Sequence, residues 1–413
     1  MDRKLRQAMF LFFMALFVFI VTVTISEYRN MEKLKSEYPD LPKEAYELRK
    51  DGLAVWGIRL ILSFLIPLLL LTTGFAQMIS VKIGRSRGLF SSGLICGLIF
   101  FGLIFMLNLP LNYYSSFHLS HKYGLSNQTF LRWLEVNIKG FLINDLVLCM
   151  FLWVPYFLMS RFPRSWWLQL GIIFIPIIIF MVFISPLVID PLFNKYTHIE
   201  DERLGQEITK LLDKAGISDA DIFRVDKSRD TKTMNAYMTG ILKSKRIVLW
   251  DTTTNNLEER EVLNITAHEI GHYVKGHIWK NIIFGIFGSF VLLYLLYITA
   301  NWILDMSYGS FGFKNIYNYA SIPLFIIVLN LYTLIGNPIM NYASRHMEVE
   351  ADSYEISLTE DREAAVTAME KLYKQSLGIP RPSNIYKWWY HSHPTLEERV
   401  EFYKTQPFEK IRN

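Results

Sequence analysis

The amino-acid sequence predicts a mainly α-helical, multi-pass membrane protein. Of its 413 residues, 51% are hydrophobic and 15% are aromatic, and the mean hydropathy is positive. These values exceed those of ordinary soluble globular proteins. The chain also contains a series of long apolar stretches, each near the length that a membrane-spanning helix needs. Composition and pattern therefore both favour a protein that resides in a lipid bilayer.

Seven apolar stretches reach or approach the roughly 20 residues that a helix needs to cross a hydrocarbon core about 30 Å thick. They are residues 8–26, 54–79, 89–113, 141–160, 166–189, 281–304 and 319–340. The first follows the basic sequence MDRKLRQ, but no small-residue cleavage site ends it, so we expect a retained helix. We interpret the mixed acidic and basic residues 27–52 as a solvated loop.

These stretches divide the chain into four parts. Residues 1–189 contain the first five membrane helices with their loops, and residues 280–340 contain the sixth and seventh. The remaining segments, 190–279 and 341–413, are polar and supply the soluble-looking mass. Two spans separate these polar segments, so both must lie on the same side of the membrane.

The segment 190–279 combines helical and extended patterns. Residues 202–216 have apolar side chains at helical spacing and end in glycine, whereas FRVDKS and KRIVLWDTT are typical of strands. The stretches TMNAYMTGI and KRIVLWD can form a small β-hairpin around LKSK, which would leave an edge for an extended peptide. A helix should follow, with Asn256 as its N-cap and Glu259 three positions later.

The sequence HEIGHYVKGH places a metal-binding pattern on that helix. His268 and His272 are four residues apart, so both imidazoles face the same way and can hold one ion, while Glu269 projects toward a bound water. This HExxH spacing is typical of zinc hydrolases, in which the glutamate is the general base. His277 lies about 140° further round the helix, so we expect a polar helix end there rather than a ligand.

A zinc hydrolase needs a third protein ligand, and the sequence NYASRHMEVEADSYE offers one. Glu348 can complete the zinc shell, and Asp352, four residues later on the same face, can accept the distal N–H of a ligand histidine. We expect Glu350 and Glu355 to lie on other faces in solvent. An acidic helix alone is more often a solvated face, but here both polar segments share one side of the membrane.

Other features limit the range of functions. The net charge of +5 is spread along the chain without a long basic run, so nucleic acid is not an expected partner. Cys96 and Cys149 lie inside apolar stretches, which argues against a disulfide framework or a cysteine zinc site. Asp145, near the start of the fourth span, either faces the interior of the helix bundle or lies at the membrane interface.

The motifs HEIGH, SRHMEVEAD and HSHPTLEER together resemble those of the type I CAAX prenyl proteases, which are integral membrane zinc endopeptidases of the gluzincin kind. Residues 108–130 and 189–197 resemble family segments as well, so the resemblance covers most of the chain. It implies a zincin-like catalytic part and seven transmembrane helices that enclose a large chamber. It also implies a peptide or protein substrate next to the bilayer, either lipidated or unmodified.

Residue by residue, the resemblance implies that Zn²⁺ is bound by His268, His272 and Glu348, with Glu269 as the base and Asp352 behind the ligands. Asn235 matches the strand that binds substrate, and His393 and Arg399 match positions that face the substrate near the metal. His393 could stabilise the oxyanion, and Arg399 could pair with a substrate carboxylate or with the residues behind the ligands.

The length of the chain and the absence of a KDEL-type signal favour a bacterial cell membrane, or the endoplasmic reticulum membrane if the chain is eukaryotic. Basic residues are balanced between the two sides, so only the resemblance places the catalytic side in the cytosol.

Three alternatives to a CAAX-processing enzyme remain open at this point. The first is a quality-control metalloprotease that does not require prenylation. The second is an intramembrane protease with its HExxH motif inside a span, which the charges at 258–261 disfavour. The third is a seven-helix transporter or scaffold with a non-catalytic metal site, which the intact Glu269 disfavours because a structural site needs no base.

Overall fold

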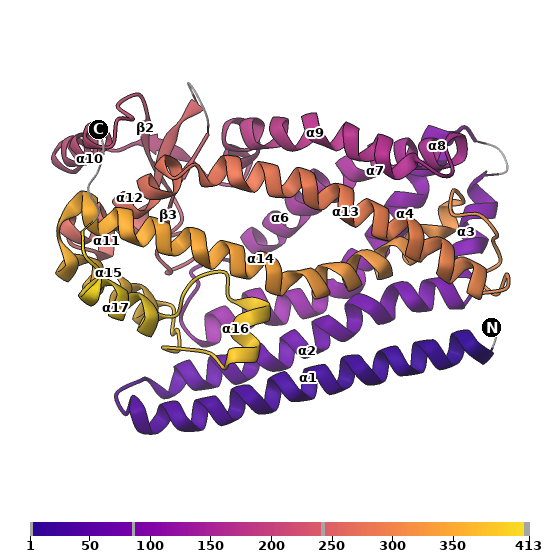
Figure 1. The fold of residues 1–413 in the computed structure, drawn as a ribbon, viewed down its shortest axis with the longest axis horizontal. Coiled ribbons are helices and arrows are strands. Elements are labelled where there is room, and N and C mark those ends of the chain that lie inside the picture. The colour runs from indigo at the N-terminus through magenta and orange to yellow at the C-terminus, as the bar shows by residue number, and fades with distance from the viewer. Residues whose placement is uncertain (1–2, 85–86, 241–243, 409–413) are drawn as a thin grey trace.

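The computed structural model describes residues 3–84, 87–240 and 244–408, and most of these are helical (Figure 1). The long helices are α1 (Arg3–Glu37), α2 (Lys43–Thr72), α4 (Leu89–Asn112), α9 (Trp166–Ile184), α13 (His277–Met306) and α14 (Ile322–Thr359). The shorter ones are α3 (Phe75–Gly84), α5 (Leu119–Lys122), α6 (Phe130–Gly140), α7 (Val147–Phe151), α8 (Trp153–Arg161), α10 (Glu202–Lys214), α11 (Asp251–Asn256), α12 (Glu259–Val274), α15 (Arg362–Gln375), α16 (Asn384–Tyr390) and α17 (Leu396–Thr405). Short 3₁₀ turns lie at Asp190–Leu192 and Tyr319–Ser321.

Within the described residues, seven helical stretches are long and apolar enough to cross a membrane, as the sequence predicts. They are Arg3–Glu37, Lys43–Thr72, Leu89–Lys122, Phe130–Arg161, Trp166–Leu192, His277–Met306 and Tyr319–Thr359. Helices suit this task because they satisfy their backbone hydrogen bonds internally in lipid. The third, fourth and fifth spans contain π-helical turns at Tyr113–His118, Phe141–Leu146 and Ser185–Ile189, and Asp145 lies in the second of these.

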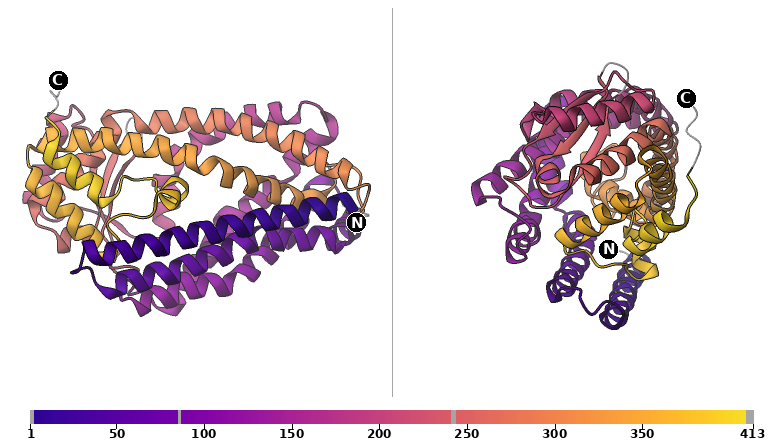
Figure 2. Two further views of the ribbon diagram at one scale, coloured as in Figure 1. Left: turned by 60° about the horizontal axis from the view of Figure 1, so that its bottom comes forward. Right: turned by 90° about the vertical axis from the view of Figure 1, so that its left-hand side faces the viewer.

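The catalytic segments gather at one end of the bundle. In Figure 1 and in the left view of Figure 2, the helices α10, α12, α15 and α17 lie together at the end opposite the N-terminus. Their apolar core joins Ile208 of α10, Ile247 of the sheet, Ile270 of α12 and Tyr354 of α14. A second, larger core packs the membrane helices against one another. The seventh span, α14, belongs to both cores and so connects the bundle to the catalytic end.

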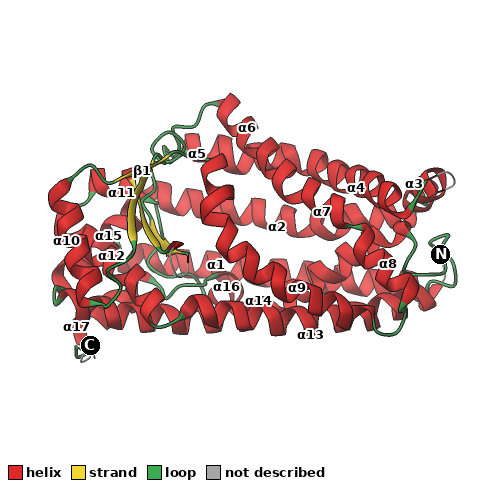
Figure 3. Ribbon diagram, turned by 90° about the horizontal axis from the view of Figure 1, so that it is seen from above, coloured by secondary structure: helices red, strands yellow, loops and turns green. Residues whose placement is uncertain are grey.

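A four-stranded sheet lies within the catalytic end (Figure 3). Its strands are β1 (Tyr196–His198), β2 (Asp221–Val225), β3 (Ala236–Thr239) and β4 (Arg246–Trp250), in the order β1-β2-β4-β3. β3 and β4 pair antiparallel, as the hairpin prediction requires, whereas β2 runs parallel to β4. The predicted turn LKSK lies partly outside the described residues. β3 is an edge strand, and it packs against α12.

Residues 27–52 are not the solvated loop that their charges suggested. They form the end of α1 and the start of α2, and Met31, Leu34 and Tyr46 are buried there in a small apolar cluster. Their spacing is helical, and several charges form pairs along the helices, such as Lys33 with Glu37 and Lys43 with Glu47. The balance of charges therefore reflects ion pairs along helices rather than a solvated loop.

Candidate metal centre and active site

The helix that carries HExxH begins with a capping box, two residues later than expected. Glu258 is the N-cap of α12, and the Glu261 carboxylate accepts the Glu258 backbone N–H at 2.9 Å. The predicted pair of Asn256 and Glu259 is wrong, because Asn256 is the last residue of the separate helix α11. The helix still begins with a capping box, because reciprocal hydrogen bonds between Glu258 and Glu261 satisfy free amides in its first turn.

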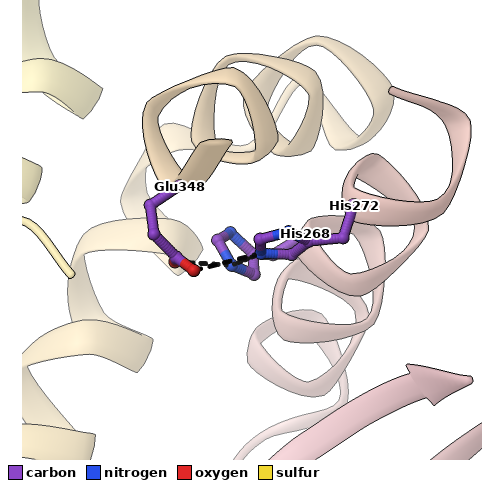
Figure 4. A group of neighbouring side chains, drawn as sticks. All are labelled: His268, His272 and Glu348. Carbon is purple, nitrogen blue, oxygen red and sulfur yellow. Dashed lines mark hydrogen bonds and ion pairs between the residues drawn. The ribbon is translucent and has the colours of Figure 1, made fainter. Parts of the chain in front are cut away.

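Three candidate metal ligands converge from two helices (Figure 4). His268 and His272 lie on α12 with their Nε2 atoms 3.0 Å apart. Glu348 of α14 faces them, with Oε2 3.4 Å from His268 Nε2 and Oε1 3.4 Å from His272 Nε2. His268 and Glu348 are buried, so the three groups form an enclosed donor set that faces a single point.

This donor set fits a tetrahedral zinc ion. With zinc–ligand distances of 2.0–2.1 Å, neighbouring ligand atoms in a tetrahedron lie about 3.3 Å apart. The two Nε2 atoms, 3.0 Å apart, are close to that spacing, and each lies 3.4 Å from one of the two Glu348 oxygens. The Oε2 atom of Glu348 is also buried without a hydrogen-bond partner among the described residues, which a metal ion would correct.

Asp352 and Arg399 stand directly behind His268. The Asp352 Oδ1 atom lies 2.9 Å from His268 Nδ1, on the side of the ring away from Glu348. Arg399 donates to both oxygens of Asp352, from Nε at 3.0 Å and from Nη2. Arg399 is only 7% exposed, so its guanidinium is engaged inside the protein and does not face solvent. Arg399 was expected to pair either with a substrate carboxylate or with the residues behind the candidate ligands. Its contacts with Asp352 favour the second role.

Glu355 does not lie in solvent, contrary to the prediction. It is fully buried, with Oε2 3.5 Å from His268 Nδ1, and it accepts a hydrogen bond from the Tyr403 hydroxyl at 2.7 Å. The same hydroxyl contacts Asp352 Oδ1 at 3.0 Å. The spacing 348, 352, 355 follows one face of a helix, and Tyr403 lies four residues after Arg399. The spacing of these residues in the sequence is therefore a signal for both Glu355 and Tyr403.

His277 supports His272 instead of ending the helix in solvent. His277 is 2% exposed, and its Nδ1 lies 2.8 Å from His272 Nδ1. Its Nε2 lies 2.8 Å from the exposed Glu350 carboxylate, which also pairs with Lys280. With Glu350 as acceptor, His277 can donate from Nε2 and accept from His272 at Nδ1. The expectation that His277 is not a ligand agrees with this geometry, but its surroundings are not those of a polar helix end.

Glu269 projects from α12 toward the edge strand β3. The backbone N–H of Met238 in β3 hydrogen-bonds to its carboxylate, while burial raises the pKa of Glu269 above its usual value. A carboxylate with a raised pKa is a stronger base than an exposed one. Glu269 thus has the environment that a general base needs beside the two histidines.

Asn235 lies immediately before β3, with its backbone fixed and its side chain exposed. Its N–H donates to Thr253 Oγ1 at 2.9 Å, and its C=O accepts from the Trp250 N–H at 3.1 Å. Its side-chain Oδ1 accepts the N–H of Ala236 at 2.9 Å. Asn235 is therefore held at the end of the edge strand, where an added peptide strand would pass.

His393 approaches the three ligands from the loop between α16 and α17. Its Nε2 lies 3.4 Å from Glu348 Oε1, and its Nδ1 lies 2.9 Å from the Ser392 hydroxyl. The side chain is 58% exposed, which leaves room for a ligand next to it. Burial of part of the ring lowers the pKa of His393, so the imidazole is neutral near pH 7. Asp145, in contrast, lies within the fourth span and contacts none of these groups among the interactions described.

A multi-span helical bundle that presents an HExxH helix against a glutamate-bearing helix defines an integral membrane metallopeptidase. Residues 198–406 match the model of peptidase family M48, and residues 42–195 match that of the CAAX prenyl protease N-terminal region, described as five membrane helices. The chain belongs to peptidase family M48. It is therefore a metalloendopeptidase that acts on peptides or proteins, and the transporter or scaffold alternative is excluded.

Individual relatives agree with this assignment. The chain is 32% identical over 296 residues to the uncharacterized metalloprotease YhfN of Bacillus subtilis, covering 72% of this chain and 69% of the relative. It is 33% identical over 314 residues to CAAX prenyl protease 1 of Saccharomyces cerevisiae, covering 71% and 68%. The crystal structure of S. mikatae Ste24p matches 95% of this chain and 97% of its own, with a TM-score of 0.81 and 26% identity.

Proposed function

We propose that this protein is a zinc-dependent endopeptidase that hydrolyses peptide bonds of membrane-associated or prenylated, CAAX-type substrates. The single observation that carries the proposal is the convergence of His268, His272 and Glu348 on one point beside Glu269. The similarity to CAAX prenyl protease 1 of yeast supports the choice of substrate class. An apolar chamber among the seven spans would give a lipid group a place while its peptide reaches the metal.

In the proposed mechanism, His268, His272 and Glu348 hold zinc, which when bound lowers the pKa of water toward about 7 and polarises the scissile carbonyl. Glu269 takes the proton of the attacking water and later delivers it to the leaving amine. His393, neutral near pH 7, donates a hydrogen bond to the developing oxyanion. Asp352 accepts the Nδ1–H of His268 and so fixes the tautomer that leaves Nε2 free to bind.

The substrate is proposed to bind as an extended strand along β3. β3 is the edge of the sheet and packs against α12, so a peptide added there would run beside the metal ligands. Asn235 at the start of this edge would hold the substrate backbone through its side-chain amide. The strand also supplies the Met238 N–H that contacts Glu269.

The proposed setting is a bacterial cell membrane, with the catalytic end in the cytosol. The similarity to YhfN of Bacillus subtilis supports the bacterial membrane, and the resemblance to CAAX proteases supports the orientation. The helix α12 lies outside the seven candidate spans, so the motif meets substrate at the end of the bundle rather than within a span. This placement favours an enzyme of membrane-associated substrates over an intramembrane protease.

The test is a cleavage assay on protein purified in detergent, with metal analysis, using paired farnesylated and unmodified CAAX peptides. We expect the wild type to contain about one zinc and to cut the farnesylated peptide, and Glu269→Gln to lose about 10²–10⁴-fold in rate while it keeps its metal. Glu259→Gln, on the same helix but paired with Arg203 at the surface, is the matched control and should remain active.

Each outcome of this assay has a distinct meaning. Equal cleavage of both peptides would support a quality-control protease that does not need prenylation. Bound zinc without cleavage of either peptide would overturn the CAAX substrate class and direct attention to unmodified membrane proteins. Full activity of Glu269→Gln would overturn the proposed role of Glu269.

A further inference from the structure

The short helix α16 connects the first two membrane helices to the metal centre. In Figure 1 it lies between α14 and the pair α1 and α2, and it packs against both α14 and α1. Its last residue, Tyr390, is followed three positions later by His393, which faces Glu348. The position of α16 therefore determines where His393 lies.

The N-terminal end of α16 is attached to a buried ion pair. Glu27 of α1 is fully buried, and its Oε1 accepts hydrogen bonds from Arg49 of α2, from Nε at 2.8 Å and from Nη2 at 2.6 Å. The other oxygen, Oε2, accepts the backbone N–H of Ser383, the N-cap of α16, at 2.8 Å. The Arg49 guanidinium also lies 3.8 Å from the centre of the Tyr386 ring. One carboxylate thus joins α1, α2 and α16.

The C-terminal end of α16 is attached to the helix that carries Glu348. Asn341 of α14 donates to the Trp389 carbonyl at 2.7 Å, and Arg345 of α14 donates to the His391 carbonyl at 2.6 Å. Arg345 lies three residues before Glu348, about one helical turn away. The loop that carries His393 therefore starts from a helix that is fixed at both ends.

We infer that Glu27 and Arg49 are positioning residues for His393: they hold the start of α16 and thereby set the approach of the His393 imidazole to the metal centre. This inference rests on the proposed function, in which His393 faces the reacting carbonyl. Glu27 lies before both ranges matched by the family models, which begin at residues 42 and 198. The first helix thus contributes to the site although the matched family regions do not include it.

The buried pair of Glu27 and Arg49 should fix the position of α16 more than it stabilises the fold. A buried ion pair often adds little net stability over apolar residues of the same size, but it fixes a geometry because each partner is costly to leave alone. Other contacts also hold this region, since Asn30 donates to the Arg381 carbonyl at 2.9 Å and Arg381 pairs with Glu37 and Glu397. Neutralising the pair should therefore loosen α16 without unfolding the protein.

The test variant is Glu27→Gln/Arg49→Met, which removes both charges and avoids an unpaired buried ion. We expect hydrogen–deuterium exchange in residues 384–394 to rise by about tenfold, because the N-cap of α16 loses its carboxylate acceptor. We expect kcat for peptide cleavage to fall by about tenfold, since small misplacements of a catalytic group are costly, while zinc content and exchange in residues 259–274 stay unchanged. Asp51→Asn, which breaks a pair of α2 with Lys122 and does not touch α16, is the control.

A double-mutant cycle with His393→Ala identifies the route of the effect. If Glu27 and Arg49 act through His393, their replacement should cause no further loss of kcat in the His393→Ala background. A loss of the same size in both backgrounds would overturn the inference, as would unchanged exchange in residues 384–394. If the wild type cuts no peptide, the proposed function fails, and the exchange measurement by itself still decides whether the ion pair fixes α16.

Discussion

At the scale of single residues, the metal centre depends on a small buried network behind His268. Asp352 and Glu355 bring two carboxylates to His268 Nδ1, and Arg399 supplies the only cation in the described network, while the Tyr403 hydroxyl donates to Glu355. Two buried carboxylates near one arginine are tolerable because hydrogen bonds satisfy most of their oxygens. The neutral His268 imidazole would donate its Nδ1–H to these carboxylates, and zinc, when bound, would provide the remaining positive charge. Through these contacts, the orientation of His268 would be coupled to the binding of a metal ion.

Apart from the candidate ligands themselves, Asp352 should have the largest effect on zinc affinity. Asp352→Asn keeps the size of the side chain but weakens the acceptor for His268 Nδ1–H, so zinc affinity should fall by about 10–100-fold. Competition with a fluorescent zinc chelator measures this change. Glu360→Gln at the end of α14, where the exposed carboxylate lies 3.8 Å from Lys214, should have no effect. An unchanged affinity in Asp352→Asn would mean that Asp352 does not support His268.

At the scale of elements, the metal centre is a packing contact between α12 and α14. Gly271, between the two histidines, lies against α14: a Cβ atom built there would stand 3.1 Å from the Ala351 carbonyl and 3.1 Å from Tyr354 Cβ. The neighbouring atoms belong to the helix itself, so they cannot rotate away. Because Gly271 has no side chain, α12 and α14 can approach closely enough for His268 and His272 to reach Glu348.

We therefore expect Gly271→Ala to separate the two helices slightly. The strain of an added methyl group in a close helix contact is about 1–3 kcal/mol, so the variant should have a lower thermal midpoint and a lower zinc affinity. Gly288→Ala in α13, where a Cβ would meet no atom within 4 Å, is the matched control. Tight zinc binding by Gly271→Ala at wild-type affinity would contradict this account of the contact.

The packing of α16 should depend on pH through His391. Burial, followed by the charge of Arg49, lowers the pKa of His391 to about 4, whereas a histidine in a detached segment titrates near about 6.5. The detached state therefore binds the proton more readily. The stabilisation of the packed state is complete above about pH 6.5 and is lost as the pH falls toward about 4.

Hydrogen exchange in residues 384–394, corrected for the intrinsic pH dependence of exchange, measures this effect. Protection should be greater at pH 7 than at pH 5 in the wild type. His391→Asn, which cannot titrate, should show the same protection at both values. If protection in the wild type does not change with pH, then His391 does not govern the packing of α16.

At the scale of the whole molecule, seven spans place the two ends of the bundle on opposite sides of the membrane. The catalytic helices gather at one end, and the loop between α13 and α14 lies at the other (Figure 1). The seventh span, α14, continues beyond the bundle and carries Glu348 into the catalytic end. One continuous helix, α14, therefore both crosses the membrane and contributes Glu348 to the candidate site.

Cysteine labelling can test this topology, because the native Cys96 and Cys149 are both buried. Glu401→Cys in α17 and Lys314→Cys in the opposite loop replace exposed residues. In oriented vesicles, an impermeant maleimide should label them from opposite sides, and the cytosolic side should label position 401. Labelling of both from one side would contradict the seven-span topology, and labelling of 401 from outside would reverse only the proposed orientation.

The sequence by itself determined the seven spans, the HExxH helix and the association of Glu348 with the histidines. The spans can be predicted from length and hydropathy, and the HExxH site from the spacing of residues on a helix. The association of 190–279 with 341–413 follows from the number of spans between them. Each of these is a local or countable property of the sequence. Only the tertiary structure decided that Glu355 is buried, that His277 supports His272 and that Glu27 holds α16. Sequence periodicity shows which side chains share a helix face, but burial depends on which other element packs against that face, and a single helix does not contain that information.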